Sequence, residues 1–402
     1  MKDIVTERLR SVKASPSMAA KARVDALRAA GMTIVDFTLG EPDFPTPSHI
    51  VQAAIDAMLA GQTRYTGSSG TPTLRKAIAR KLERENGLSY APEDIVVGCG
   101  AKQIIFNAFA SSLDPGDEVI VPAPFWASYP DMVAINGGIP VIVPCAAPDG
   151  LKLTAPALES AISPRTRWVV LNTPNNPSGA VYTGEELRAI TNVLLRHPEV
   201  WVLTDEIYEH FIYGDARHIS PVRLEPVLQR RALVVNGVSK AYAMTGWRVG
   251  YGAGPRPLIK AIDLLLSQST TCPSAISQAA AVAALEGPQA CVAEAVAMFS
   301  GRRDRMVALL NDIPGFRCAH PSGAFYVFAS VEGLIGKTDP AGGKLDSSLA
   351  VMSFLLERAG VAAIDGASYG MEPYLRLSFA TSLDQIEQGC ARIRKACASL
   401  DE

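Results

Sequence analysis

Short apolar runs alternate along this chain with longer stretches in which apolar residues recur every three or four positions. The short runs are rich in Val, Ile and Leu, which is typical of strands buried on both faces of a parallel sheet. The longer stretches predict helices between the strands. The predicted strands are Ile95–Gly98, Glu118–Val121, Pro140–Val143, Trp168–Leu171, Trp201–Thr204, Leu233–Asn236 and Val249–Gly252, and the predicted helices include Lys102–Ser112, Gly184–Leu195 and Pro257–Ser267. This alternation predicts an α/β fold with a mostly parallel, doubly wound sheet.

The pattern changes beyond Gly287. The elements predicted there are a long helix at Gln289–Leu310, a strand at Phe325–Ala329, a Gly-rich loop, a helix at Ser348–Ala359, a strand at Tyr374–Phe379 and a last helix. A further helix, Pro16–Ala30, precedes the sheet and has no strands of its own. We therefore expect a large domain over residues 47–285 and a smaller α+β domain built from both chain ends, residues 1–46 and 286–402.

Composition narrows the class of protein. The net charge is −2 over 402 residues, so there is no basic excess of the kind that nucleic-acid binders show. The seven cysteines are scattered without CxxC or Cys/His metal spacing, which favours reduced thiols in a cytoplasmic protein without a metal site. The charged start does not resemble a secretory signal, and the uncharged stretch Leu264–Leu285 contains too many polar residues for a membrane span.

Lys240 stands in a polar, glycine-containing segment after the predicted strand Leu233–Asn236. A lysine held partly out of water can lose its proton near neutral pH, because desolvation disfavours the ammonium. The neutral amine can form a Schiff base with an aldehyde. Arg248 follows eight residues later, and its guanidinium has the geometry to fix a phosphate. An aldehyde and a phosphate in one ligand describe pyridoxal phosphate (PLP).

Two polar residues at the end of another predicted strand fit the same ligand. Asp205 follows Trp201–Thr204, and Tyr208 comes three residues later. Ligands of α/β sheets bind beyond the carboxyl ends of the strands. A carboxylate there can pair with the protonated pyridine nitrogen of PLP, and a phenol beside it can bond the ring oxygen. The alternative is a surface aspartate that merely ends a strand.

Two loops after predicted strands are further candidates. The segment Asn172–Gly179 carries two prolines and a glycine, which make a rigid loop that can hold Asn176 towards a ring oxygen. Gly100, Ala101 and Lys102 open a predicted helix, whose N-terminal amides favour a phosphate. An ordinary turn is the alternative for the first loop. A dinucleotide-binding loop is the alternative for the second, although Gln103 stands where that motif has glycine.

Four other residues have both a functional and a structural interpretation. Trp126 can stack on a ring or simply pack. Arg376 is a lone cation in an apolar strand, where it can clamp a substrate carboxylate or extend to the surface. Gly40 precedes a loop rich in proline and acid, and permits a close backbone approach to that carboxylate. Tyr65 lies in a Gly/Ser loop and has no role from the sequence pattern alone.

At this point the chain closely resembles the PLP-dependent aminotransferases of fold type I, class I, and among them the bacterial aspartate aminotransferase group. The resemblance runs from about Lys13 to Leu400. It rests on eight ordered motifs: LGEPDFPTP, RYTGSSGTPTLRKAI, DPGDEVIVPAPFWASYPDM, NTPNNPSGAVY, TDEIYEH, SKAYAMTGWRVGY, PSGAFYVF and LRLSFA. Such a set implies the PLP-transferase fold, with a large sheet domain and a smaller α+β domain.

The resemblance also implies a role for each candidate. Lys240 would anchor PLP and shuttle the substrate proton. The other cofactor contacts would come from Asp205 at the ring nitrogen, Tyr208 and Asn176 at the ring oxygen, Trp126 on the ring, and Gly100, Ala101, Lys102 and Arg248 at the phosphate. Tyr65 would reach the phosphate of a neighbouring subunit, which implies a homodimer with shared sites. Arg376 and Gly40, with Trp126 and Asn176, would hold the α-carboxylate of an amino acid or 2-oxo acid in a ping-pong reaction.

One departure leaves the substrate side chain open. Animal-type aspartate aminotransferases place an arginine for the second carboxylate in the stretch that matches Ser267–Thr271, and none stands there. By resemblance to the bacterial group, Lys13 and Ser17 are candidates instead. Aspartate or glutamate is the expected donor, with prephenate or aromatic specificity, or another PLP reaction such as β-elimination, as alternatives. A non-catalytic regulator and a nicotinamide-dependent oxidoreductase fit the sequence less well.

Overall fold

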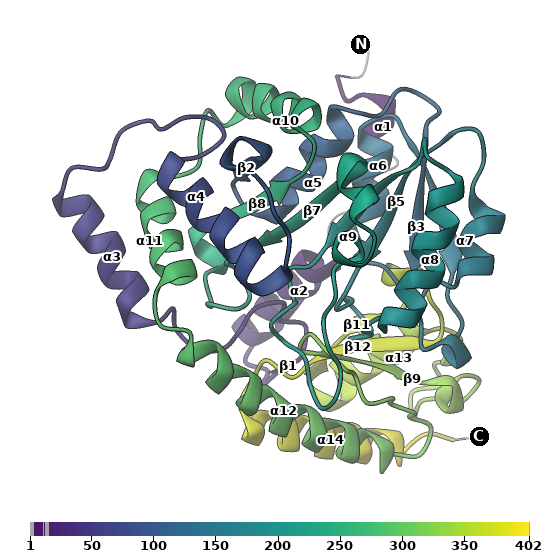
Figure 1. Ribbon diagram of the computed structural model, residues 1–402. Helices are drawn as coiled ribbons and strands as arrows, with labels where there is room; N and C mark the ends of the chain where they lie inside the picture. Colours follow the sequence, from purple (N-terminus) through teal and green to yellow (C-terminus); the bar gives the residue numbers. More distant parts are fainter. Residues whose placement is uncertain (1–3, 11, 13–15, 402) are drawn as a thin grey trace.

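The computed structural model describes residues 4–10, 12 and 16–401, and its largest element is a seven-stranded sheet (Figure 1). The strand order is β2-β8-β7-β6-β5-β3-β4. Its strands are β2 (Ile95–Gly98), β3 (Glu118–Ala123), β4 (Ile139–Pro144), β5 (Thr166–Asn172), β6 (Trp201–Asp205), β7 (Ala232–Gly237) and β8 (Gly250–Ala253). All pairs are parallel except those of β8, which runs antiparallel to β2 and β7. Each predicted strand of the α/β region is therefore present in this sheet.

Helices cover both faces of the large sheet, which is why its central strands are apolar throughout. One face packs against α4, α8 and α11, and the other packs against α5, α6 and α10. The helices of this region are α3 (Ser48–Leu59), α4 (Pro72–Lys81), α5 (Ala101–Ala110), α6 (Ser128–Ile135), α7 (Ala155–Ala161), α8 (Gly184–Arg196), α9 (Pro221–Leu224), α10 (Arg256–Ser269) and α11 (Ala275–Glu286). A π-helical turn, Leu82–Asn86, continues α4.

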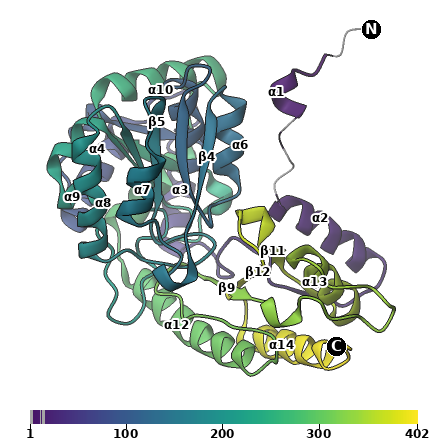
Figure 2. The same cartoon turned by 90° about the vertical axis from the view of Figure 1, so that its right-hand side faces the viewer.

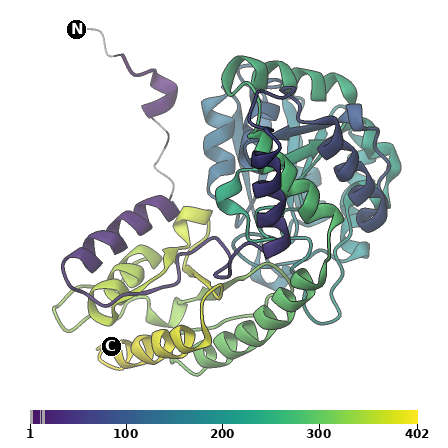
Figure 3. The same cartoon turned by 90° about the vertical axis from the view of Figure 1, so that its left-hand side faces the viewer.

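A second group of elements has its own core and lies beside the first (Figures 2 and 3). Its strands form an antiparallel sheet, β11-β12-β9, and a short parallel pair, β1-β10, that joins the two ends of the chain. The strands are β1 (Val35–Asp36), β9 (Tyr326–Ser330), β10 (Val361–Ala362), β11 (Ile364–Asp365) and β12 (Tyr374–Ser378). The helices are α2 (Pro16–Ala29), α12 (Ala290–Asn311), α13 (Ser348–Phe354) and α14 (Leu383–Cys397), with the separate short helix α1 (Glu7–Arg10). The helix predicted at Ser348–Ala359 changes to a π-helical turn at Leu355–Ala359.

The long helix α12 connects the two groups. Val292 near its start packs in the core under the large sheet, whereas Ala295 and Phe299 belong to the second core. Along the described part of the chain, no single helix has the length and hydropathy of a membrane span, and α11 with α12 passes such a test only as a pair bent by 79°. The domain boundaries near residues 46 and 285 stay a prediction.

Candidate active site

A cavity of about 420 Å³ lies beyond the carboxyl ends of β5, β6 and β7, where the two groups of elements face each other. Both groups contribute to its wall: Asp205 ends β6, whereas Arg376 stands in β12. Ten of the twelve predicted site residues line it: Gly40, Ala101, Lys102, Trp126, Asn176, Asp205, Tyr208, Lys240, Arg248 and Arg376. Gly100 adjoins the wall, and Tyr65 lies elsewhere. Residues more than 300 positions apart in the sequence therefore share one site.

Lys240 occupies the inner part of the cavity wall. Its Nζ donates a hydrogen bond of 2.6 Å to the carbonyl oxygen of Gly40 and lies 5.8 Å from the centre of the Tyr208 ring. Burial lowers the pKa of Lys240 to about 8, although the Glu41 carboxylate works in the opposite direction. A substantial fraction of this amine is therefore neutral at physiological pH.

Asp205 is buried and bonded from several sides. The Tyr129 hydroxyl donates to Asp205 Oδ2 at 2.6 Å, and the Ile207 amide donates to Oδ1 at 3.3 Å. Burial raises the pKa of Asp205 to about 6, and the Tyr129 hydrogen bond limits that rise. Tyr129 was not among the predicted residues. Its signal was present, because it stands three residues after Trp126 in the same motif, and the two rings contact each other edge-on with their centroids 5.2 Å apart.

Tyr208 and Tyr326 form a second buried pair. Their hydroxyl oxygens lie 2.9 Å apart, so one phenol donates to the other. Burial raises the pKa of Tyr208 well above its usual range. Tyr326 stands in β9 and brings a hydroxyl from the second group of elements to the cavity. Its motif, PSGAFYVF, supported the family resemblance, but no role was assigned to the tyrosine.

Arg376 is a buried cation, with only 2% of its surface exposed. Its Nη1 donates to Asn176 Oδ1 at 3.2 Å and its Nη2 to the Thr38 carbonyl at 2.7 Å. The guanidinium lies 4.4 Å from the centre of the Tyr326 ring. Its Nε has no hydrogen-bond partner, and no ion pair between described side chains includes Arg376. A buried cation without a counter-ion is a ready site for a carboxylate.

The start of α5 and Arg248 form a compact cradle for an anion. Gly100 caps the helix with φ of 90°, and a Cβ there would lie 2.4 Å from Arg248 Nη2. A Cβ on Gly250 would lie 2.1 Å from the amide nitrogen of Ala101. Both glycines are therefore needed for the close approach of guanidinium and helix N-terminus. Arg248 is held there by hydrogen bonds from Nη1 to the Thr245 carbonyl, 2.8 Å, and from Nη2 to the Cys99 carbonyl, 3.1 Å.

The groups around Trp126 extend the cavity towards solvent. The Lys102 ammonium lies 4.7 Å from the centre of the Trp126 ring, so the side chain of Lys102, and not only its backbone, faces the site. Met18 and Lys21 of α2 also line the cavity. Glu41 accepts a hydrogen bond of 2.6 Å from the Thr245 hydroxyl. Met18, Lys21 and Glu41 were not predicted, because their part in the site depends on how the second group of elements meets the sheet.

The other residues and segments that the sequence analysis considered are not seen in the wall of this cavity. Tyr65 is 87% exposed and does not line it within one chain. The stretch Ser267–Thr271 does not contribute to its wall either. Lys13 lies outside the described residues, and although Ser17 falls in α2, its side chain is also outside them.

The fold and the cavity define an α/β enzyme in which a partly buried amine lies between a buried carboxylate, an anion cradle and an arginine that has no ion pair with a described side chain. Residues 32–393 match the family described as aminotransferase class I and II, and the chain belongs to that family. It is 50% identical over 393 residues to the aspartate aminotransferase of Rhizobium meliloti (strain 1021), covering 98% of this chain and 96% of the relative. It is also 50% identical over 395 residues to a probable aspartate/prephenate aminotransferase of Rhizobium leguminosarum bv. phaseoli, covering 98% and 99%.

Similarity in structure agrees with similarity in sequence. The crystal structure of the Rhizobium meliloti aspartate aminotransferase matches with a TM-score of 0.97 at 49% identity, covering 99% of this chain and 100% of that one. The fold is therefore that of the fold type I PLP-dependent enzymes, as predicted, and the prediction of an aminotransferase is confirmed.

Proposed function

We propose that this chain is a PLP-dependent aminotransferase that moves an amino group between aspartate or glutamate and a 2-oxo acid by a ping-pong reaction. The observation that carries the proposal is Lys240. Its amine has a pKa lowered to about 8 and bonds the Gly40 carbonyl, between the buried carboxylate of Asp205 and the unpaired guanidinium of Arg376.

The residues of the cavity fit PLP. The cradle of Gly100, Ala101, Lys102 and Arg248 suits its phosphate, because glycines and a helix N-terminus leave amides and a guanidinium free to face an anion. Asp205 suits the pyridine nitrogen, Tyr208 and Asn176 suit the ring oxygen, and Trp126 suits the ring face. When bound, PLP supplies an aldehyde that carries the amino group and a ring that stores the electron pair of the broken Cα–H bond.

The chain supplies binding, orientation and proton transfer. Arg376 and Asn176, with the backbone at Gly40, hold the α-carboxylate, so that the substrate Cα faces Lys240. The neutral amine of Lys240 would take the proton from the substrate Cα and deliver it to the cofactor carbon that carries the amino group. Asp205 keeps the ring nitrogen protonated, and Tyr129 keeps Asp205 ionised near neutral pH.

We infer that Lys102 meets the side-chain carboxylate of the substrate. Among the described residues, which do not include Lys13, the cations that line the cavity are Lys21, Lys102, Lys240, Arg248 and Arg376. Three of these have other roles, and Lys21 is paired with Asp25 at 3.1 Å. Lys102 lies over the same ring, Trp126, that would stack on the cofactor. The names of the two relatives, one of them aspartate/prephenate aminotransferase, support a dicarboxylate and leave prephenate as the alternative acceptor.

We also propose a homodimer in the cytoplasm. The exposed phenol of Tyr65 supports a shared site, in which it would reach the phosphate held by a second copy. The same proposal covers the division into a domain of residues 47–285 and one of residues 1–46 and 286–402, which the two separate cores support.

Half-reactions test the proposal. Purified enzyme with bound PLP is mixed with aspartate alone, and the visible spectrum, oxaloacetate and ammonia are measured. We expect conversion of PLP to pyridoxamine phosphate with one oxaloacetate per site and no ammonia. Release of ammonia would indicate β-elimination instead. A second series with prephenate and with aromatic 2-oxo acids as acceptors decides between the two specificities. A protein without PLP absorbance would contradict the proposal altogether.

A further inference from the structure

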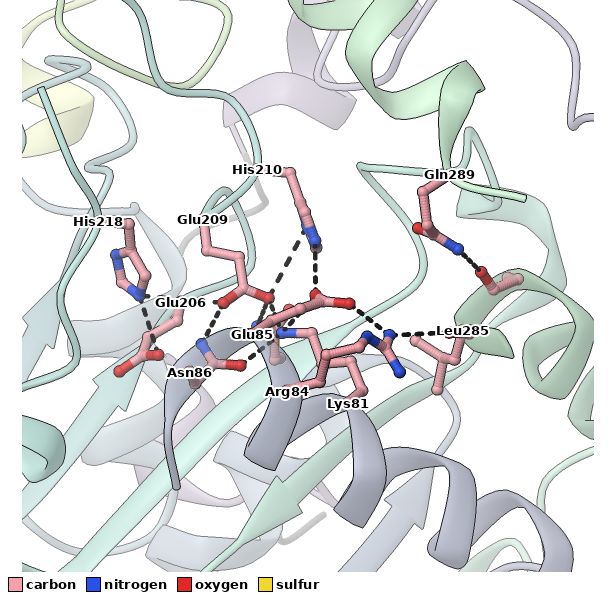
Figure 4. A network of polar contacts seen from close by, with 12 residues as sticks. Lys81, Arg84, Glu85, Asn86, Glu206, Glu209, His210, His218, Leu285 and Gln289 are labelled. Atoms are coloured by element: carbon pink, nitrogen blue, oxygen red, sulfur yellow. Dashed lines mark hydrogen bonds and ion pairs between the residues drawn. The ribbon is translucent and has the colours of Figure 1, made fainter. Parts of the chain in front are cut away.

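A buried polar cluster surrounds Glu206 and Glu209, which stand in the same turn as Asp205 and Tyr208 but do not line the active-site cavity. Figure 4 shows Glu206 and Glu209 with the neighbouring side chains Lys81, Asn86 and His218. The members of the cluster are Lys81, Asn86, Glu206, Glu209, His218 and Asn236. The turn contributes to two cavities with different linings: Asp205 and Tyr208 line the active site, whereas Glu209 lines a separate cavity of about 900 Å³.

Glu209 is the centre of this cluster. Its carboxylate accepts hydrogen bonds from the Lys81 ammonium, from the Asn86 amide and, at 2.7 Å, from the Asn236 amide. Lys81 also donates to Asn86 Oδ1 at 2.8 Å and is only 1% exposed. Burial raises the pKa of Glu209, but the Lys81 ammonium lowers it, and the net result is a pKa below its ordinary value. Glu209 is thus an ionised carboxylate with a fixed orientation.

Asn236 connects Glu209 to the segment of the active-site lysine. Asn236 stands in β7, and its Oδ1 accepts a hydrogen bond of 2.7 Å from the amide of Gly237. The chain then continues through Ser239 to Lys240. On its other side Glu209 directly follows Tyr208. One carboxylate therefore ties the turn that bears Asp205 and Tyr208 to the strand end that bears Lys240.

Glu206 forms a second tie in the same turn. It accepts a hydrogen bond of 2.9 Å from the Thr204 hydroxyl and one of 3.0 Å from His218 Nε2. Burial lowers the pKa of His218, but the Glu206 carboxylate raises it, so this pKa lies above its usual value. The Lys81 ammonium and the His218 imidazole therefore face the two buried carboxylates, Glu209 and Glu206 respectively.

Two groups in this area also have the spacing of metal ligands: Glu85, Glu209 and His210, and Glu206, Glu209 and His218. The Lys81 ammonium already contacts Glu209 and lies 3.5 Å from Glu85. The positive charge that a metal would bring is supplied by this side chain, so the cluster is complete as an ion-pair network.

We propose that Glu209 is a positioning residue of the aminotransferase reaction: with Lys81 as its counter-ion, it fixes Asp205 and Tyr208 relative to Lys240 through Asn236. This inference rests on the proposed function, since it assigns Asp205, Tyr208 and Lys240 to one cofactor. A buried ion pair elsewhere in the protein would contribute to stability alone. Glu209 instead controls the distance between an electrostatic partner of the cofactor ring and the amine that acts beside it.

The test compares Glu209→Gln with a matched variant, Glu118→Gln, in the PLP-bound enzyme. Glu118 is also a buried glutamate and is bonded to Ser163 and Arg165, but it stands at the start of β3, which lies between β5 and β4, and it does not line the active-site cavity. Three quantities are measured: the melting temperature, kcat and KM for aspartate, and the midpoint of the pH titration of the visible absorbance of bound PLP.

We expect both variants to melt at lower temperature, because each loses half of an ion pair. Only Glu209→Gln shifts the absorbance midpoint and lowers kcat, by about 10- to 100-fold with KM changed little, because small displacements of reacting groups are costly. If Glu209→Gln behaves as Glu118→Gln does, Glu209 has a structural role only and the proposal is wrong. A wild-type enzyme that does not transaminate would instead contradict the proposed function itself.

The double variant Lys81→Met/Glu209→Gln covers the case in which the single variant does not fold. It removes both charges, so we expect the melting temperature to recover while kcat and the absorbance midpoint stay altered. If the melting temperature, kcat and the absorbance midpoint all recover, the proposal is wrong, because Glu209 would then be needed only to balance the charge of Lys81. Dialysis of the wild type against a chelator should change none of them, and a fall in kcat would mean that a metal, and not Lys81, pairs with Glu209.

Discussion

The two regions that enclose the active site supply different kinds of contact. The region of the large sheet contributes Lys240, Asp205 and Arg248, which face the proposed position of PLP. The region built from the chain ends contributes Arg376 and the backbone at Gly40, which face the proposed position of the substrate carboxylate. Because a hydrogen bond from Lys240 to Gly40 crosses between the regions, the amine is placed where both ligands meet. The difference predicts two classes of variant, one affecting cofactor properties and one affecting substrate binding.

The largest effect is expected from Lys240→Ala, which belongs to the first class and removes both the anchor and the proton carrier. General acid–base catalysis alone contributes about 10²–10⁴-fold, so we expect kcat to fall by at least about 10⁴-fold. Stopped-flow measurement of the aspartate half-reaction checks this. Lys260→Ala, at an exposed lysine of α10, is the control and should keep full activity. Normal turnover by Lys240→Ala would show that Lys240 is not the catalytic amine, and the division into cofactor and substrate variants would then be wrong.

The next effect belongs to the second class. Arg376→Lys keeps the charge but loses the planar group that reaches Asn176 and Thr38 together. Hydrogen bonds to charged groups contribute about 1.5–3 kcal/mol, so kcat/KM for aspartate should fall about 10- to 150-fold. The visible spectrum and the affinity for PLP should not change. The control is Arg305→Lys, at an exposed ion pair with Glu387. Loss of PLP from Arg376→Lys would show that the region built from the chain ends also binds the cofactor, and not only the substrate.

A smaller, pH-dependent effect is expected from Tyr129→Phe. The Tyr129 hydroxyl lowers the pKa of Asp205, which burial raises to about 6, so its removal moves this pKa further upward. Asp205 is ionised above its pKa, and the affinity for PLP should therefore decline as pH falls through about 6 in the wild type and at a higher pH in the variant. Dissociation constants measured between pH 5 and 8 check this. Tyr182→Phe, at a buried phenol that bonds the Leu153 amide, should leave the profile in place.

The sequence predicted the large sheet better than the rest of the fold. Runs such as Trp168–Leu171 are apolar because both faces of the strand are covered, and this leaves a clear local pattern. The antiparallel direction of β8 has no such pattern, since it depends on which strands lie beside it. The strands β1 and β10 have two residues each and are paired across the whole chain, so no periodicity could reveal them.

The site shows the same contrast. Asp205 ends β6 and Lys240 follows β7, at the carboxyl ends where the topology itself gathers polar residues. Arg248 precedes β8, whose antiparallel direction brings its start to the same edge of the sheet. Tyr326 and Thr38 reach the cavity only because the chain ends pack against that sheet, and Thr38 acts through its carbonyl, which has no side-chain signal. Their places could be found only from three-dimensional structure.

The smallest effect is expected from Tyr326→Phe, which tests a residue that contacts both the cofactor side and the substrate side of the cavity. Its hydroxyl bonds Tyr208, on the cofactor side, and its ring lies under Arg376, on the substrate side. The variant keeps the ring and loses one hydrogen bond, which contributes about 0.5–1.5 kcal/mol, so kcat/KM should fall less than about 15-fold. Because the Tyr208 phenol loses its partner while Arg376 keeps its ring, the absorbance of bound PLP should shift and KM should not. Tyr374→Phe, whose ring stacks on Phe328 outside the cavity, is the control. A rise in KM with an unchanged spectrum would place Tyr326 wholly on the substrate side and sharpen the boundary between the two regions.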